Sequence, residues 1–105
     1  MRAWKKAKIT VVKKFIAEDL INEFAHDDVK QKFLDSCPAF EINQEFILEK
    51  PSPPEGFCPW AWADIHRDLI AVMGGGGLPW MKDDGLAMVC CTDGFRPVVF
   101  KIELV

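Results

Sequence analysis

The stretch LAMVCCTDGFRPVVFKIELV, residues 86–105, decides the fold of this chain. Two β-type segments, 86–91 and 96–105, flank Asp93-Gly94, a dipeptide typical of a hairpin turn. Every second residue of the later segment belongs to one apolar face: Val98, Phe100, Ile102 and Leu104. Because strand side chains point to alternate faces, this pattern predicts a C-terminal β-hairpin with one buried face.

The sequence before the hairpin predicts two more strands and a set of helices. Periodicity and flanking charges give a strand over 8–14, a helix within 15–27, a short helix over 28–34, a strand over 44–49 and a helix over 59–73. In the first helix Ile16, Leu20 and Phe24 form an i, i+4, i+8 stripe, and Asp27 or Asp28 is expected to cap the second. The order β-α-β-α-β-β predicts an α+β fold: a small antiparallel or mixed sheet of about four strands with helices mainly on one face.

Length and composition indicate one ordinary globular domain over residues 1–105. Half of the 105 residues are apolar, 28% are charged, and the formal net charge is −3. This acidic balance argues against nucleic-acid binding, which usually requires a basic excess. No secretory signal pattern or membrane-spanning run is present, so we expect a cytoplasmic protein with reduced cysteines.

The segment FCPWAW, residues 57–62, predicts that one cysteine lies at the start of a helix. Proline favours the first position of a helix, so Pro59 makes Cys58 the expected N-cap. The unpaired N–H groups at a helix start stabilise a thiolate, and reactive cysteines are often built this way. Trp60 and Trp62 would shield this site. The alternative is a buried Cys58 that only fills space.

Four cysteines are the candidate metal ligands: Cys37, Cys58, Cys90 and Cys91. Cys37, Cys58 and one of Cys90 or Cys91 fall at the ends of different elements, where three thiolates could hold a soft ion such as zinc or iron. Adjacent strand residues face opposite sides, so only one of Cys90 and Cys91 is expected to reach any one site. With a two-residue turn Cys91 would lie opposite Arg96, whereas a three-residue loop would bring Cys90 there.

Large rings are numerous for so short a chain, with four tryptophans and eight phenylalanines. A small domain cannot easily bury them all, so the remainder is expected to line a ligand pocket or an oligomer interface. The candidate ligand-binding residues are Trp60, Trp62, Trp80 and Arg96. Between the two outcomes, homo-oligomerisation is favoured.

A resemblance to other proteins rests on four blocks of the sequence: SCPAF, EGFCPWAWADI, LPW and CCTDGFRPVVFKIE. In this combination the chain resembles a family of short, uncharacterised prokaryotic proteins of about 100 residues. The resemblance implies a prokaryotic source and a domain that stands alone. It transfers no catalytic role to any residue.

Three functions from different classes remain open on the sequence. The first is a small binding protein with a cysteine-lined site for a soft metal or a thiol-reactive ligand. The second is a thiol redox enzyme or sensor that uses Cys58. The third is a structural or oligomeric interaction module whose cysteines only pack in the core.

Overall fold

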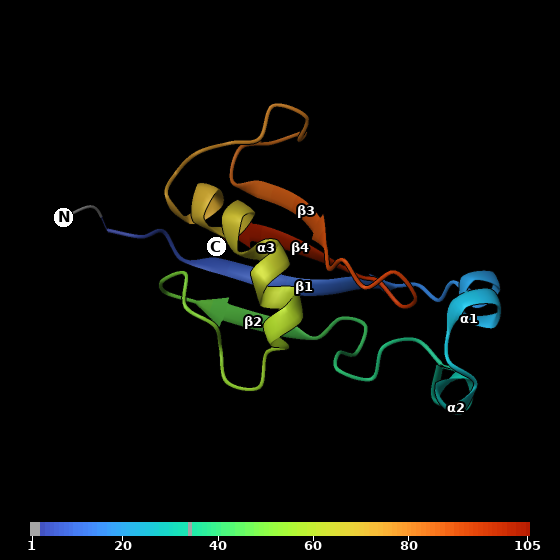
Figure 1. Cartoon of the computed structure of the whole chain (residues 1–105). Helices are drawn as coiled ribbons and strands as arrows, with labels where there is room; N and C mark the ends of the chain where they lie inside the picture. The colour runs from blue at the N-terminus through green and yellow to red at the C-terminus, as the bar shows by residue number, and fades with distance from the viewer. Residues whose placement is uncertain (1–2, 34) are drawn as a thin grey trace.

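The computed structural model describes residues 3–33 and 35–105, and its centre is a four-stranded antiparallel sheet (Figure 1). The strands are β1 (Ala7–Lys14), β2 (Glu45–Leu48), β3 (Leu86–Cys90) and β4 (Val98–Leu104), in the spatial order β2-β1-β4-β3. The predicted α+β class, element order and C-terminal strand pair are therefore confirmed.

One face of the sheet is apolar because alternate residues of β1 and β4 are aligned in register. Ile9 lies opposite Ile102, and Val11 lies opposite Phe100. All four side chains are fully buried. The register shifts between Val11 and Lys13, where a β-bulge gives β1 one extra residue. Beyond this bulge Lys14 faces the same side as Val98, and its ammonium donates to the Phe40 carbonyl at 2.6 Å.

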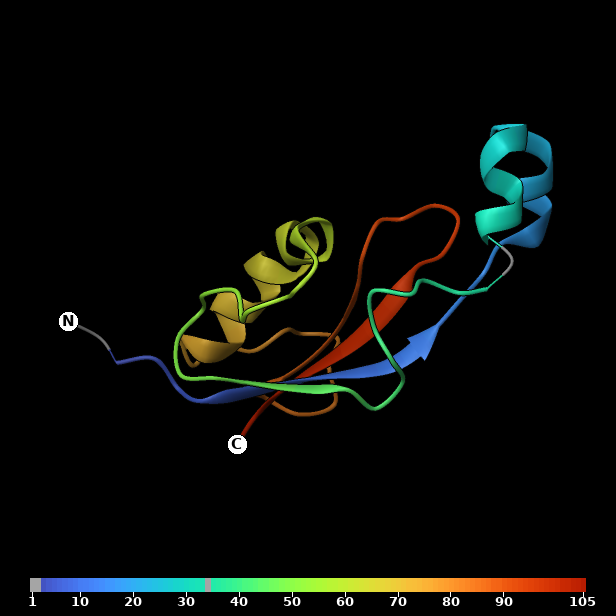
Figure 2. The same cartoon turned by 90° about the horizontal axis from the view of Figure 1, so that it is seen from below.

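The helix α3 (Pro59–Met73) covers this apolar face (Figure 2). Its observed bounds match the predicted 59–73, from the proline at its first position to the glycine that follows it. Side chains at helical spacing, namely Ala61, Ile65, Leu69, Val72 and Met73, are buried against the sheet. This single layer of helix on sheet forms the core.

In the described part of the chain, no helix lies over the opposite face of the sheet (Figure 2). This face carries charged side chains. The Lys8 ammonium lies 3.4 Å from a Glu45 oxygen and 3.7 Å from a Glu103 oxygen. The Lys101 ammonium lies 3.4 Å from the same Glu103 oxygen. The two Lys8 pairs join β1 to its neighbours β2 and β4, whereas the Lys101 pair lies within β4. The lysine stems cover part of the sheet from water.

The hairpin between β3 and β4 has a wider loop than the Asp93-Gly94 dipeptide predicts. The Cys91 N–H donates to the Val98 carbonyl at 3.0 Å, so residues 92–97 form the loop. One Asp93 carboxylate oxygen accepts from the Phe95 and Arg96 N–H groups at 2.9 and 3.1 Å. In this Asx-type turn, the Asp93 side chain satisfies backbone N–H groups of the loop itself. A two-residue turn does not need such side-chain hydrogen bonds.

The first helical region forms an arm that projects from the sheet (Figures 1 and 2). It consists of α1 (Glu18–Phe24), α2 (Asp27–Lys30) and the 3₁₀ turn η1 (Gln31–Phe33). The cap of α2 is His26, whose ring nitrogen accepts from the Asp28 N–H at 3.1 Å, and not the predicted Asp27 or Asp28. The molecule is 51 Å long and 22 Å thick, because the arm extends its long axis.

Within α1 only Ile21 is buried. The stripe of Ile16, Leu20 and Phe24 does not face the core as a helical stripe usually does: Leu20 is 40% exposed and Phe24 67% exposed. In the described residues, no helix is both long and apolar enough to cross a membrane.

Candidate functional site

Cys58 lies where the sequence predicts it, at the N-cap of α3. Its side chain is half-buried, packs against the core and makes no capping hydrogen bond. The preceding Phe57 is buried, with its ring centroid 5.0 Å from those of both Phe40 and Phe46. The ring of Phe57 therefore anchors the start of α3 in the core. A reactive role for Cys58 stays a prediction.

Cys90 and Cys91 point to opposite faces of the sheet, as adjacent strand residues must. Cys90 is exposed, whereas Cys91 is buried on the α3 side. The Cys91 sulfur accepts a hydrogen bond from the Val98 N–H at 3.3 Å. Cys91 lies opposite Val98 and not opposite Arg96, since the loop is longer than either predicted turn. Its thiol has a structural role in closing the ladder.

The four cysteines do not form one cluster. Cys37 and Cys58 pack on the edge of the core, Cys91 lies inside it, and Cys90 faces outward. Within residues 3–33 and 35–105, no group of three or more His, Cys, Asp or Glu side chains is arranged to hold a metal ion.

The three tryptophans expected to share a site occupy different environments. Trp62 is half-buried, with its ring centroid 5.8 Å from Phe57 and 5.3 Å from the His66 ring. Trp80 is 73% exposed in the loop before β3. Trp60, on the first turn of α3, is 65% exposed. Trp60 lines a hollow of the surface.

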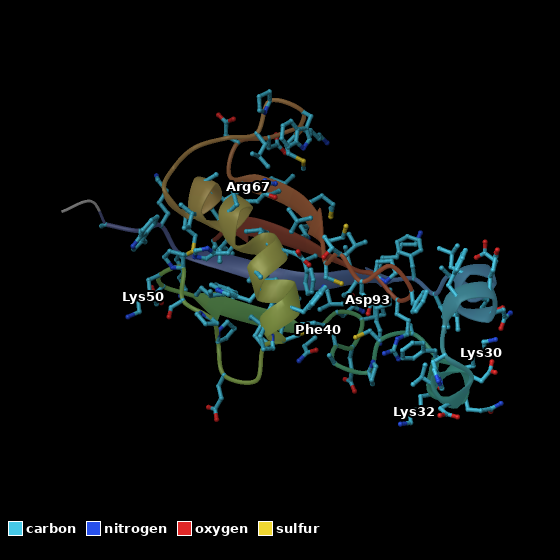
Figure 3. The ribbon with its side chains drawn as sticks, in the orientation of Figure 1. Lys30, Lys32, Phe40, Lys50, Arg67 and Asp93 are labelled. Carbon is cyan, nitrogen blue, oxygen red and sulfur yellow. The ribbon has the colours of Figure 1, made fainter. Side chains whose placement is uncertain are left out.

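The hollow at Trp60 is an apolar cup of about 430 Å³. Its other walls come from the hairpin loop: Thr92, Asp93, Gly94 and Phe95. Asp93 is labelled in Figure 3, in the loop that runs from the sheet toward the arm. The cup joins the start of α3 to the tip of the hairpin, two places that are 32 residues or more apart in the chain.

A carboxylate on α3 holds the hairpin loop in this position. Asp64 accepts the Thr92 N–H at 2.7 Å and its hydroxyl at 3.0 Å. Local spacing on a helix cannot reveal a partner 28 positions away in the chain, so the sequence alone did not identify this contact. Asp64 was therefore missed as a residue that shapes the candidate site.

Arg96 belongs to the base of the arm and not to a thiol site. Its guanidinium carbon lies 4.2 Å from the centroid of the Phe33 ring, and Phe33 lies 5.8 Å from the Phe95 ring. This cation–π stack fixes η1 against the hairpin loop. The buried Nε of Arg96 has no hydrogen-bond partner within the described part of the chain.

Comparison of the chain with protein-family models, with curated proteins and with solved structures finds no match. Any function must therefore be inferred from the surfaces and side chains described above.

Proposed function

We propose that this chain is a small interaction module that works by binding further copies of itself. The observation that carries the proposal is the arm, whose helix α1 extends from the sheet with Leu20 and Phe24 facing solvent. Water contact with large apolar side chains is unfavourable by roughly 25 cal/mol per Å². A contact that covers this stripe would remove that cost.

The shape of the molecule supports the same proposal. The Cα radius of gyration is 15.3 Å. A compact chain of this length is expected to have a radius of gyration of about 13 Å. An arm that leaves the core, instead of packing on it, is a common way for small chains to exchange contacts with their copies.

The thiol-based alternatives have less support in the geometry. The cysteines occupy separate environments, and Cys91 is committed to the hydrogen bond from Val98. Self-association needs no bound ion and uses the apolar residues that the fold leaves uncovered. It also agrees with the homo-oligomer expected from the aromatic content.

Sedimentation velocity over a wide range of protein concentration tests the proposal. The wild-type chain is expected to associate, and the double variant Leu20→Ser/Phe24→Ser to weaken association by about 30-fold or more, the effect of losing an interface anchor. Both side chains are exposed, so the variant should fold normally, which circular dichroism checks.

Asn22→Ser is the matched control, because Asn22 is exposed on another side of the same helix. It should associate as the wild type does. A wild-type chain that remains monomeric at the highest concentration would exclude self-association as the function.

A further inference from the structure

The acceptor for the arm is indicated by a second apolar hollow, at the far end of the long axis. This hollow, of about 320 Å³, is lined by Trp4, Ile70, Ala71, Gly74 and Gly76. It lies where α3 ends, near the N-terminus, whereas the arm occupies the other end of the molecule (Figure 1). Trp4 and Ile70 are both exposed.

The hollow is built into the fold. The Lys5 N–H donates to the Met73 carbonyl at 2.9 Å, which holds the N-terminal segment against the last turn of α3. Trp4 then lies beside Gly74, where an added Cβ would be 3.7 Å from the indole ring. Because Gly74 and Gly76 have no side chains, none of the described residues fills the space between Trp4 and the end of α3.

Basic side chains lie near the hollow. The Lys5 side chain runs beside Gly75, since an added Cβ there would be 3.2 Å from the Lys5 Cε. Arg67 lies one turn before Ile70 and Ala71 on α3; its side chain is almost fully exposed, and its Nε lies 3.6 Å from an Asp68 carboxylate oxygen. The hollow therefore has an apolar floor with Lys5 beside it, and Arg67 lies one helical turn further along α3.

The arm has the complementary composition. The α1 sequence EDLINEF contains three carboxylates and no basic residue. Helical spacing places Asp19 and Glu23 along one flank of the Leu20 and Phe24 stripe. An apolar stripe with an acidic flank matches an apolar hollow with basic side chains near it in both chemistry and charge sign.

We propose that α1 of one copy binds in the Trp4–Ile70 hollow of the next copy, with Phe24 and Leu20 on the apolar floor and Glu23 and Asp19 beside Lys5 and Arg67. This inference rests on the proposed self-association and specifies its partner surfaces. The two surfaces are different and lie at opposite ends, so the contact is heterologous. Repeated in one direction, such contacts generate rings or open filaments; exchanged reciprocally between two copies, they give a two-fold dimer in which each arm occupies the other copy's hollow.

A mixing experiment with two defective variants tests this arrangement. The arm variant Leu20→Ser/Phe24→Ser retains its hollow, and the hollow variant Trp4→Ser/Ile70→Ser retains its arm. Each variant alone is expected to be monomeric. An equimolar mixture should form a heterodimer of one copy of each, because only one functional contact is left and growth stops there.

The other outcomes separate this inference from the proposed function. A hollow variant that still self-associates as the wild type does would overturn the head-to-tail contact and leave self-association intact. A mixture that stays monomeric would also overturn the contact. Ala63→Ser, an exposed position two turns earlier on α3, is the control and should associate normally.

Charge reversal gives an independent test that leaves the apolar residues in place. Asp19→Lys/Glu23→Lys and Lys5→Glu/Arg67→Glu should each weaken association by about 10-fold or more, since like charges then face each other. Combining all four changes in one chain should restore association. Failure of the combined chain to regain it, with its fold intact, would argue against the assigned pairing.

Discussion

At the residue scale, the two adjacent cysteines show that a shift of one residue along the chain decides the role of a thiol. Cys90 and Cys91 have the same chemistry, but only Cys91 lies in the core and accepts the Val98 N–H. The sequence predicts that the two face opposite sides, because strand side chains alternate. Which of them is buried depends on the loop length, and the Asp93 turn makes this loop longer than the dipeptide signal indicates.

This difference predicts unequal effects of two alanine substitutions. Cys91→Ala removes the acceptor of a buried N–H and should lower the free energy of unfolding by about 1–3 kcal/mol. Cys90→Ala changes an exposed side chain and should alter it by less than about 0.5 kcal/mol. Urea denaturation with unchanged m-values measures both. Equal losses would contradict the structural role given to Cys91.

At the element scale, the parts that were predicted well are those with local signals. The start of α3 is fixed by Pro59 and its end by Gly74, so its bounds follow from neighbouring residues. The strand alternation in β4 likewise depends only on the side chains of β4. The outward direction of the α1 stripe could not be predicted, because periodicity identifies an apolar face without identifying what covers it.

The same limit applies to the candidate site. The cup joins Trp60 to the hairpin loop, and the Asp64 hydrogen bonds that hold it connect residues 28 positions apart. Residue types drew attention to Trp60 and Arg96, but they did not show that Arg96 stacks on Phe33. Long-range contacts of this kind come from the fold and leave no mark on local spacing.

The turn that begins β3 provides a graded test at this scale. Gly85 has a φ of +75°, and an added Cβ would lie 2.9 Å from the Leu104 Cδ1. Gly56 has a φ of +77° but open space around it, and Gly94 has open space and no left-handed backbone. A comparison of substitutions at these three glycines therefore separates the cost of backbone strain from the cost of steric contact.

Alanine at each of these positions should give three different losses in the free energy of unfolding. Gly94→Ala should change it by less than about 0.5 kcal/mol. Gly56→Ala should lower it by about 1–2 kcal/mol through left-handed strain. Gly85→Ala should lower it by about 1 kcal/mol more, because Leu104 must shift. Thermal and urea unfolding measure the series. If Gly94→Ala were as unstable as Gly85→Ala, the explanation by backbone strain and steric contact would be refuted.

At the scale of the whole molecule, the placement of apolar surface sets this chain apart from a compact domain. One layer of helix on sheet forms a core between α3 and the apolar side of β1 and β4. The arm lies outside this core and is attached at its base by the contacts of Phe33, Phe95 and Arg96. The Ala17 N–H also donates to the Phe95 carbonyl there, at 2.8 Å. A chain that needed only to be stable on its own would gain free energy of folding by packing the arm over its own hydrophobic surface.

The elongated shape is therefore expected to persist in solution when association is prevented. For the monomeric Leu20→Ser/Phe24→Ser variant, small-angle X-ray scattering should give a radius of gyration close to the 15.3 Å of the structure. A value near the roughly 13 Å of a compact chain would mean that the arm packs on its own sheet. In that case α1 would not be available to a neighbour, and the head-to-tail contact would lose its structural basis. Because the variant removes only exposed apolar groups, its arm should keep the Phe33–Arg96 attachment and the same extended direction.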